Sequence, residues 1–65
     1  MALSTSTILG IAQVLIQLRT LRSDYESSAK YCADHGKDSG LAFNTRRVNE
    51  IDTAIAILEK AVASK

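Results

Sequence analysis

The sequence has no proline or tryptophan, and its 65 residues include one cysteine, one histidine and three glycines. A single cysteine cannot form a disulfide within the chain, and one cysteine with one histidine supplies too few soft ligands for a structural zinc. Domains this small usually need a disulfide, a metal or association with another chain, because they bury too little surface alone. The composition therefore favours association.

The sequence also has no large excess of charge of either sign, since it contains eight Lys and Arg and seven Asp and Glu. This balance disfavours a protein that binds nucleic acid polymers through bulk charge. The longest apolar stretch, residues 8–18, is far shorter than the ~20 residues of a membrane-spanning helix. The N-terminus lacks the charged region and cleavage site of a signal peptide. With an unpaired cysteine, these features predict a soluble cytoplasmic protein that does not enter a membrane.

Apolar residues recur at alternating spacings of three and four over two long stretches, a pattern typical of helices packed along a seam. We expect one helix over residues 5–35, a turn at 36–40 and a second helix over 40–63. The hydroxyl side chains at 4–6 are candidate N-caps, and Gly36 suits the left-handed position that ends a helix. The sequence thus predicts an all-α antiparallel helical hairpin, a single domain over residues 1–65.

The seams of the two expected helices can be aligned with each other. The first consists of Ile11, Val14, Leu18, Leu21, Tyr25, Ser28 or Ala29, and Cys32. The second consists of Leu41, Asn44 or Thr45, Val48, Ile51, Ile55, Leu58 and Val62. Pairing Cys32 with Leu41, and Ile11 with Val62, puts the midpoint between Gly36 and the next residue. Turn chemistry places the connector at the same point, and this agreement supports the hairpin.

Near the chain ends, both helices carry apolar residues outside their seams. An exposed apolar patch usually marks an interface, and burying one large aliphatic side chain stabilises by about 1.5–3 kcal/mol. We therefore predict a homo-oligomer, either a four-helix bundle or a larger ring. Its expected interface residues are Ile8, Leu9, Ala12, Ile16, Ala54, Ile57 and Ala61.

Polar and aromatic residues gather toward the turn instead. Arginine forks, amides and flat aromatic rings suit a planar or phosphate-bearing ligand, and the start of the second helix adds positive potential. The candidate ligand-binding residues are Arg46, Arg47, Asn44, Thr45, Tyr25, Tyr31 and Lys30. Two simpler interpretations remain open. Arg46 pairs with Glu50 and both arginines are solvated, and the polar layer around Asn44 is only a hydrogen-bonded layer in the seam.

No arrangement of residues indicates catalysis. Cys32 and His35 lie one turn apart, with Asp34 and Asp38 nearby, and could form a metal corner or an activated thiol. Because Cys32 falls on the seam, we interpret it as a small buried apolar residue. The three glycines stand apart and form no phosphate-binding loop. We expect no enzyme, no metal and no cofactor.

The segment at residues 51–63, IDTAIAILEKAVA, resembles the C-terminal hairpin helix of phage-encoded sponges. Those proteins block CBASS or Thoeris immunity by sequestering cyclic nucleotides. The resemblance rests on Ala54-Ile55, Leu58 and Ala61-Val62-Ala63, and the family's longer N-terminal region has no counterpart here. It implies a viral anti-defence protein in which an oligomer of hairpins binds small nucleotides between subunits and catalyses nothing.

Four hypotheses follow. The first is a non-enzymatic homo-oligomer that binds a small anionic ligand such as a cyclic nucleotide. The second is a protein–protein inhibitor or adaptor that docks a partner helix through residues 8–18. The third is a nucleic-acid accessory protein that uses Arg19, Arg22, Arg46 and Arg47, which the balanced charge disfavours. The fourth is a helix on a membrane surface, disfavoured because no basic residue precedes the apolar stretch.

Overall fold

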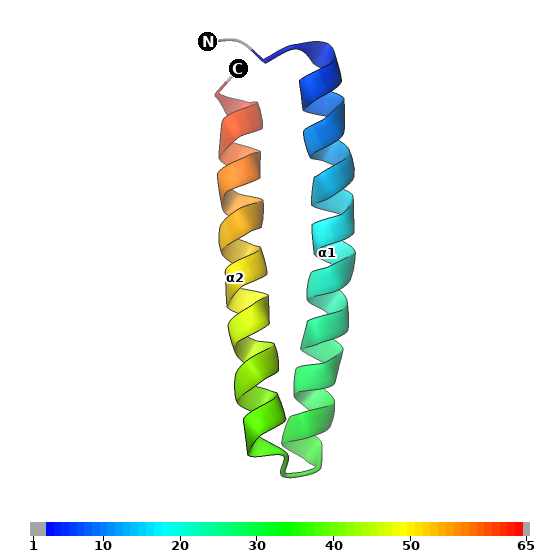
Figure 1. The fold of residues 1–65 in the computed structure, drawn as a ribbon, viewed down its shortest axis with the longest axis vertical. Coiled ribbons are helices and arrows are strands. Elements are labelled where there is room, and N and C mark those ends of the chain that lie inside the picture. The colour runs from blue at the N-terminus through cyan, green and yellow to red at the C-terminus, as the bar shows by residue number, and fades with distance from the viewer. Residues whose placement is uncertain (1–2, 65) are drawn as a thin grey trace.

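The computed structural model describes residues 3–64 as two antiparallel helices, α1 (Thr5–Asp34) and α2 (Asp38–Ala63). The start of α1 and the end of α2 lie side by side, opposite the connector, in a rod of 48 × 15 × 12 Å (Figure 1). Over the described part of the chain, neither helix is long and apolar enough to cross a membrane. The all-α hairpin predicted from the spacing is confirmed.

The helix ends follow from local hydrogen bonding. The Ser4 hydroxyl accepts the amide of Thr7 at 3.2 Å, which satisfies one free donor at the start of α1. Gly36 has φ 66°, and the amide of Lys37 donates to the carbonyl of Cys32 at 2.8 Å, closing a Schellman motif. This closure leads directly into α2, which begins at Asp38, two residues earlier than expected. The connector is therefore only residues 35–37.

The inward face of α1 differs in phase from the expected seam. Val14 and Leu21, placed in the seam from the sequence, are each 43% exposed. Leu15 is buried instead, and Arg22 is half-buried. The other inward-facing residues of α1 are Ile8, Ile11, Leu18, Tyr25, Ala29 and Cys32. The helix is thus rotated so that Arg22 comes beside α2, where it forms an ion pair.

The inward face of α2 agrees with the expected seam. It consists of Leu41, Asn44, Val48, Ile51, Ile55, Leu58 and Val62. Close to the connector the two helices approach tightly, because a Cβ atom added at Gly40 would lie 2.8 Å from the Cys32 Sγ. The Asn44 amide beside them donates to the Gly40 carbonyl at 2.8 Å. This agrees with the simpler interpretation of Asn44, as part of a hydrogen-bonded layer in the seam.

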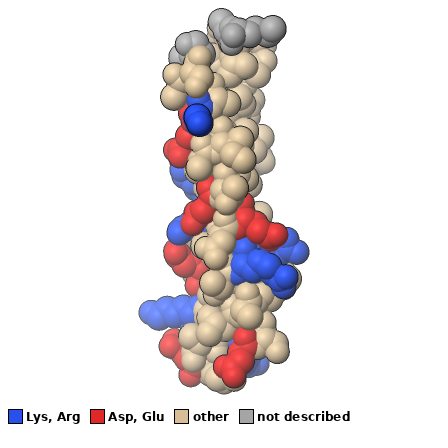
Figure 2. Space-filling model, turned by 90° about the vertical axis from the view of Figure 1, so that its left-hand side faces the viewer, with Lys and Arg blue, Asp and Glu red and all other residues tan. Residues whose placement is uncertain are grey.

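The hairpin has two unlike flanks. On the ion-pair flank, Arg19 bonds Glu59 at 2.5 Å, and Arg22 bonds Asp52 at 2.5 Å and Glu26 at 3.1 Å. The opposite side, which we call the open flank, consists of Val14, Leu21, Tyr25, Phe43, Arg47, Glu50, Ala54 and Ile57. In Figure 2, charged side chains follow the left edge of the molecule, whereas the upper half of its right edge is formed by uncharged residues, drawn in tan.

Candidate functional site: a groove on the open flank

A groove of about 280 Å³ lies between the helices on the open flank. Its lining residues are Leu18, Leu21 and Tyr25 from α1, and Phe43, Arg47, Glu50, Ile51 and Ala54 from α2. Ile51 is buried, whereas Leu21 and Phe43 are each 43% exposed. The groove therefore has an apolar floor and exposed apolar rims.

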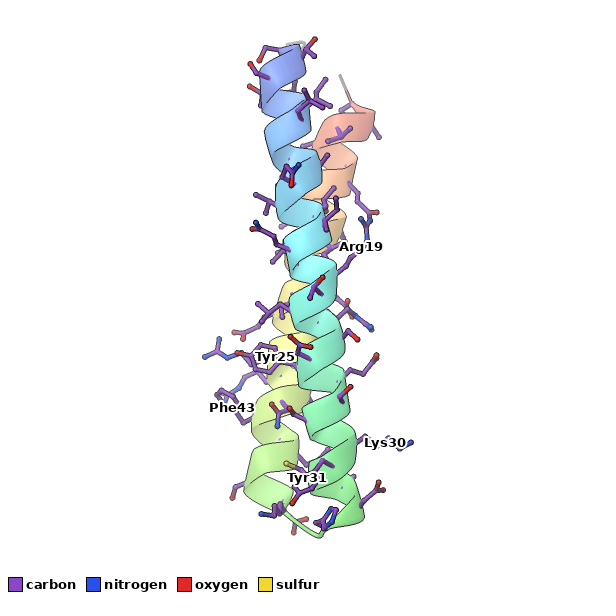
Figure 3. All side chains as sticks on the ribbon, turned by 90° about the vertical axis from the view of Figure 1, so that its right-hand side faces the viewer. Arg19, Tyr25, Lys30, Tyr31 and Phe43 are labelled. Atoms are coloured by element: carbon purple, nitrogen blue, oxygen red, sulfur yellow. The ribbon has the colours of Figure 1, made fainter. Side chains whose placement is uncertain are left out.

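Three side chains give the groove a defined shape. The rings of Tyr25 and Phe43 meet edge to face, with centroids 6.3 Å apart, and Figure 3 shows both on the same side of the hairpin. The Arg47 guanidinium lies 5.2 Å from the Phe43 ring centre, and its Nη1 donates to the Glu50 Oε1 at 2.9 Å. The arginine is thus held between an aromatic face and a carboxylate. The groove can accept an apolar surface that carries a charge of either sign.

The structure does not gather the seven expected ligand residues into one site, since only Tyr25 and Arg47 line the groove. Asn44 is buried in the seam. Figure 3 shows Lys30 pointing away from the side that carries Tyr25. Tyr31 stacks on His35 near the connector, with centroids 4.1 Å apart. Thr45 and Arg46 are exposed on α2, and Glu50 pairs with Arg47 rather than Arg46.

Phe43 is the groove residue that the sequence interpretation missed. It stands four residues before Arg47, so the two side chains share a helix face. That spacing is visible in the sequence. The rotation of α1 then brings Leu21 to the same groove.

Cys32 and His35 have separate surroundings. The Cys32 thiol is buried, with its Sγ 3.8 Å from the Asn44 Nδ2. The His35 Nδ1 lies 2.8 Å from the Tyr31 carbonyl oxygen, one turn earlier in α1. Within residues 3–64, no three His, Cys, Asp or Glu side chains come together as a metal site. The thiol and the imidazole thus have different hydrogen-bond partners.

Two arginines of the nucleic-acid hypothesis are held by carboxylates across the hairpin. Arg19 bonds Glu59, and Arg22 bonds Asp52 through two nitrogens, at 2.5 and 3.3 Å. The hydrogen bond to Asp52 raises the pKa of Arg22, and the charges of Asp52 and Glu26 act in the same direction. These arginines join the two helices, so their charge is already matched within the hairpin.

The expected interface residues divide between two surfaces. Ile8 is half-buried and faces α2, unlike the outward position expected for it. Leu9 and Ile16 are about 60% exposed on the outer side of α1, near which Ala12 is exposed. Ala54 lines the groove, and Ile57, 63% exposed, follows it by one helical turn with Ala61 beyond. The most exposed aliphatic residues thus do not form one continuous patch.

Comparison of the chain with protein-family models, curated proteins and solved structures finds no match in any of the three. The resemblance of residues 51–63 to the phage sponges is therefore a likeness of one segment. The function has to be argued from the two flanks and the groove.

Proposed function

We propose that this chain is a small non-enzymatic binding protein that acts as a homo-oligomer and binds through its open flank. The observation that carries the proposal is the groove, with Leu21 and Phe43 exposed on its rims. Exposed apolar surface around a concave site is typical of a surface that binds another chain. The ion-pair flank offers no comparable surface, because its charged side chains bond one another.

The shallow core supports association. In the described part of the chain, the buried apolar residues are Leu15, Cys32 and Ile51, and none of them is fully buried. The chain exposes 4733 Å². A folded monomer of this mass is expected to expose about 4,000 Å², so the excess is about 700 Å². Association through the open flank would remove Leu21 and Phe43, which are each 43% exposed, from water.

A second candidate is the nucleotide sponge that the resemblance implies. It is favoured by the Tyr25, Phe43 and Arg47 cluster, which offers two aromatic faces for a planar base and a guanidinium for a phosphate. Glu50 counts against it, since an anionic ligand would have to displace this carboxylate from Arg47. The adaptor hypothesis instead docks a helix of another protein on residues 8–18, where Leu9 and Ile16 are exposed on the outer side of α1.

Sedimentation equilibrium of matched variants tests the proposed function. Leu21→Asp places a carboxylate on the open flank, and Ile16→Asp makes the same change on the outer side of α1. Both side chains are exposed, so neither variant empties the hairpin core. We expect Leu21→Asp to raise the Kd of self-association at least about tenfold, and Ile16→Asp to leave it unchanged. A wild-type chain that remains a folded monomer at every concentration would refute the homo-oligomer.

Calorimetric titration separates the sponge from the other candidates. The ligands are cyclic dinucleotides, cyclic trinucleotides and ADP-ribose isomers. The sponge predicts heat that Arg47→Ala abolishes and that Arg46→Ala, a neighbouring arginine outside the groove, retains. If no ligand gives heat while the oligomer is intact, the sponge hypothesis is refuted. Capture of one partner protein that is lost in Ile16→Asp favours the adaptor.

A further inference from the structure

We infer that a second copy of this chain occupies the open flank in one defined arrangement. In it, α2 packs antiparallel on the partner's α2, about a two-fold axis that passes between Val48 and Asn49. The inference rests on the proposed self-association and specifies which surfaces meet. It follows from the order of residues along one stripe of α2.

The stripe runs the length of α2, and each member directly precedes an inward-facing residue. Its spacing alternates between three and four residues, as in the seam inside the hairpin. Its residues are Gly40, Phe43, Arg47, Glu50, Ala54, Ile57 and Ala61. One helix therefore carries two parallel seams, and only one of them is used within the hairpin.

The side chains of the stripe are complementary to those of a second copy that runs in the opposite direction. When two copies run antiparallel with their centres aligned, Arg47 of each copy comes opposite Glu50 of the other. The aromatic ring of Phe43 comes opposite the methyl group of Ala54. Beyond these, Ile57 comes level with Gly40, whose own Cβ direction points toward Cys32 within the hairpin. The two-fold axis makes each pairing twice, so large side chains meet small ones and opposite charges meet.

Neighbouring registers lack this complementarity. A shift of one heptad in one direction brings Ile57 opposite Arg47 and Glu50 opposite Ala54. A shift in the other direction carries Ile57 past the start of the partner's α2. Of the three registers, the central one alone gives Arg47 an acidic partner.

The same two-fold axis also brings the α1 helices of the two copies together. Leu21 and Tyr25 line the groove together with Arg47 and Glu50, so these four residues lie at one level of the rod. The axis therefore crosses α1 near Asp24. In the two-fold arrangement the α1 helices also run antiparallel, and Leu21 comes opposite Ser28, which is small and exposed. The product is a four-helix bundle with the two connectors at opposite ends.

The required area is available. The chain exposes 4733 Å² in total, and each partner in an interface of standard size buries roughly 800 Å². Within one copy, the Arg47 Nη1 and Glu50 Oε1 atoms are already 2.9 Å apart. Two such pairs meeting across the axis place each arginine between two carboxylates, so no charge is buried without a partner.

The test uses two charge reversals, measured separately and mixed. In Arg47→Glu, the new carboxylate faces the partner's Glu50. In Glu50→Arg, the new guanidinium faces the partner's Arg47. We expect each variant alone to raise the Kd of self-association at least about tenfold, and an equimolar mixture to recover wild-type affinity within about threefold. The mixture cannot restore the ion pair within each chain, so recovery reports on the pair between chains.

Lys30→Glu is the control, because it changes the charge by the same amount on a side chain that points away from the groove. It should leave the Kd unchanged. Native mass spectrometry of the mixture should show the mixed dimer in excess over either homodimer. A mixture that associates no better than the two variants alone overturns this arrangement, while wild-type association would still support the proposed function. A monomeric wild type overturns both.

A size exchange provides an independent check of the register. Ala54→Phe places an aromatic ring against the partner's Phe43, and we expect weaker association. Adding Phe43→Ala to the same chain restores one large and one small residue in each pairing, and association should recover. If the double variant associates more weakly than Ala54→Phe alone, the register is wrong.

Discussion

The closest approach of the two helices, where Gly40 meets Cys32, gives the sharpest prediction about stability. Replacing a helical glycine by alanine usually stabilises by about 0.5–1 kcal/mol, because the unfolded chain loses freedom. At Gly40 the new Cβ atom would lie 2.8 Å from the Cys32 Sγ, closer than the two atoms can come. Overpacking of this kind costs about 1–3 kcal/mol. We therefore expect Gly40→Ala to lower the free energy of unfolding by about 1 kcal/mol.

Gly10→Ala is the matched control, since a Cβ atom there would meet nothing within 4 Å. It should raise the free energy of unfolding by about 0.5–1 kcal/mol. Both variants are measured by urea unfolding followed by far-UV circular dichroism. The protein concentration must be the same throughout, because self-association would add to apparent stability.

A double-mutant cycle locates the cause. Cys32→Ala removes the thiol that the new methyl group would strike, so it should be less damaging with Ala at position 40 than with Gly. We expect a favourable coupling of about 1–2 kcal/mol between the two substitutions. If Gly40→Ala stabilises as much as Gly10→Ala, or if the cycle shows no coupling, the close packing described here is wrong.

Two further predictions concern the seam and the ion-pair flank. Asn44→Ala should lower stability by about 0.5–1.5 kcal/mol, because the hydrogen bond from its amide to the part-buried Gly40 carbonyl is lost. Asn49→Ala on the exposed face should change stability by less than about 0.5 kcal/mol. Arg22→Lys should lower the melting temperature in dilute buffer, and the difference from wild type should shrink in concentrated salt. Since folding raises the pKa of Arg22, its contribution is present at neutral pH and is lost only in strongly alkaline solution.

The hairpin could be predicted from the sequence because several local signals agreed. Two apolar periods, an N-cap serine and a glycine between the helices all indicated the same topology. The rotation of α1 could not be predicted from these signals. Ile11, Leu18, Tyr25 and Cys32 belong to both possible seams, and aliphatic character favoured Val14 and Leu21 as the remaining members. The structure instead turns Arg22 toward Asp52 on the other helix, and this ion pair is not part of the apolar spacing.

The Arg22 Nε and Asp52 Oδ1 atoms are 2.5 Å apart, and the two residues are 30 positions apart in the chain. A bond between residues so distant in sequence is not visible in the apolar spacing of either helix alone. The rotation of α1 therefore depends on a pairing between helices, which the period of one helix does not contain.

The candidate site was predicted only in part, for the same reason. Tyr25 and Arg47 were expected near a ligand and do line the groove, whereas Asn44 is used in the seam. Which polar residues remain available depends on which face each helix turns inward. Once α1 is rotated, Leu21 moves from the seam to the rim of the groove, beside Phe43. The groove is thus a consequence of the rotation.

The inward and outward faces of α2 also account for the apolar pattern of residues 51–63, the segment that resembles the phage sponges. Its apolar residues occur as adjacent pairs, Ala54-Ile55, Ile57-Leu58 and Ala61-Val62. In each pair the second residue faces α1, and the first belongs to the stripe on the open flank. A helix needs such pairs when it packs against two neighbours at once, because each neighbour requires its own apolar stripe. These pairs therefore fit the proposed association of two hairpins, and nucleotide binding is tested separately at Arg47.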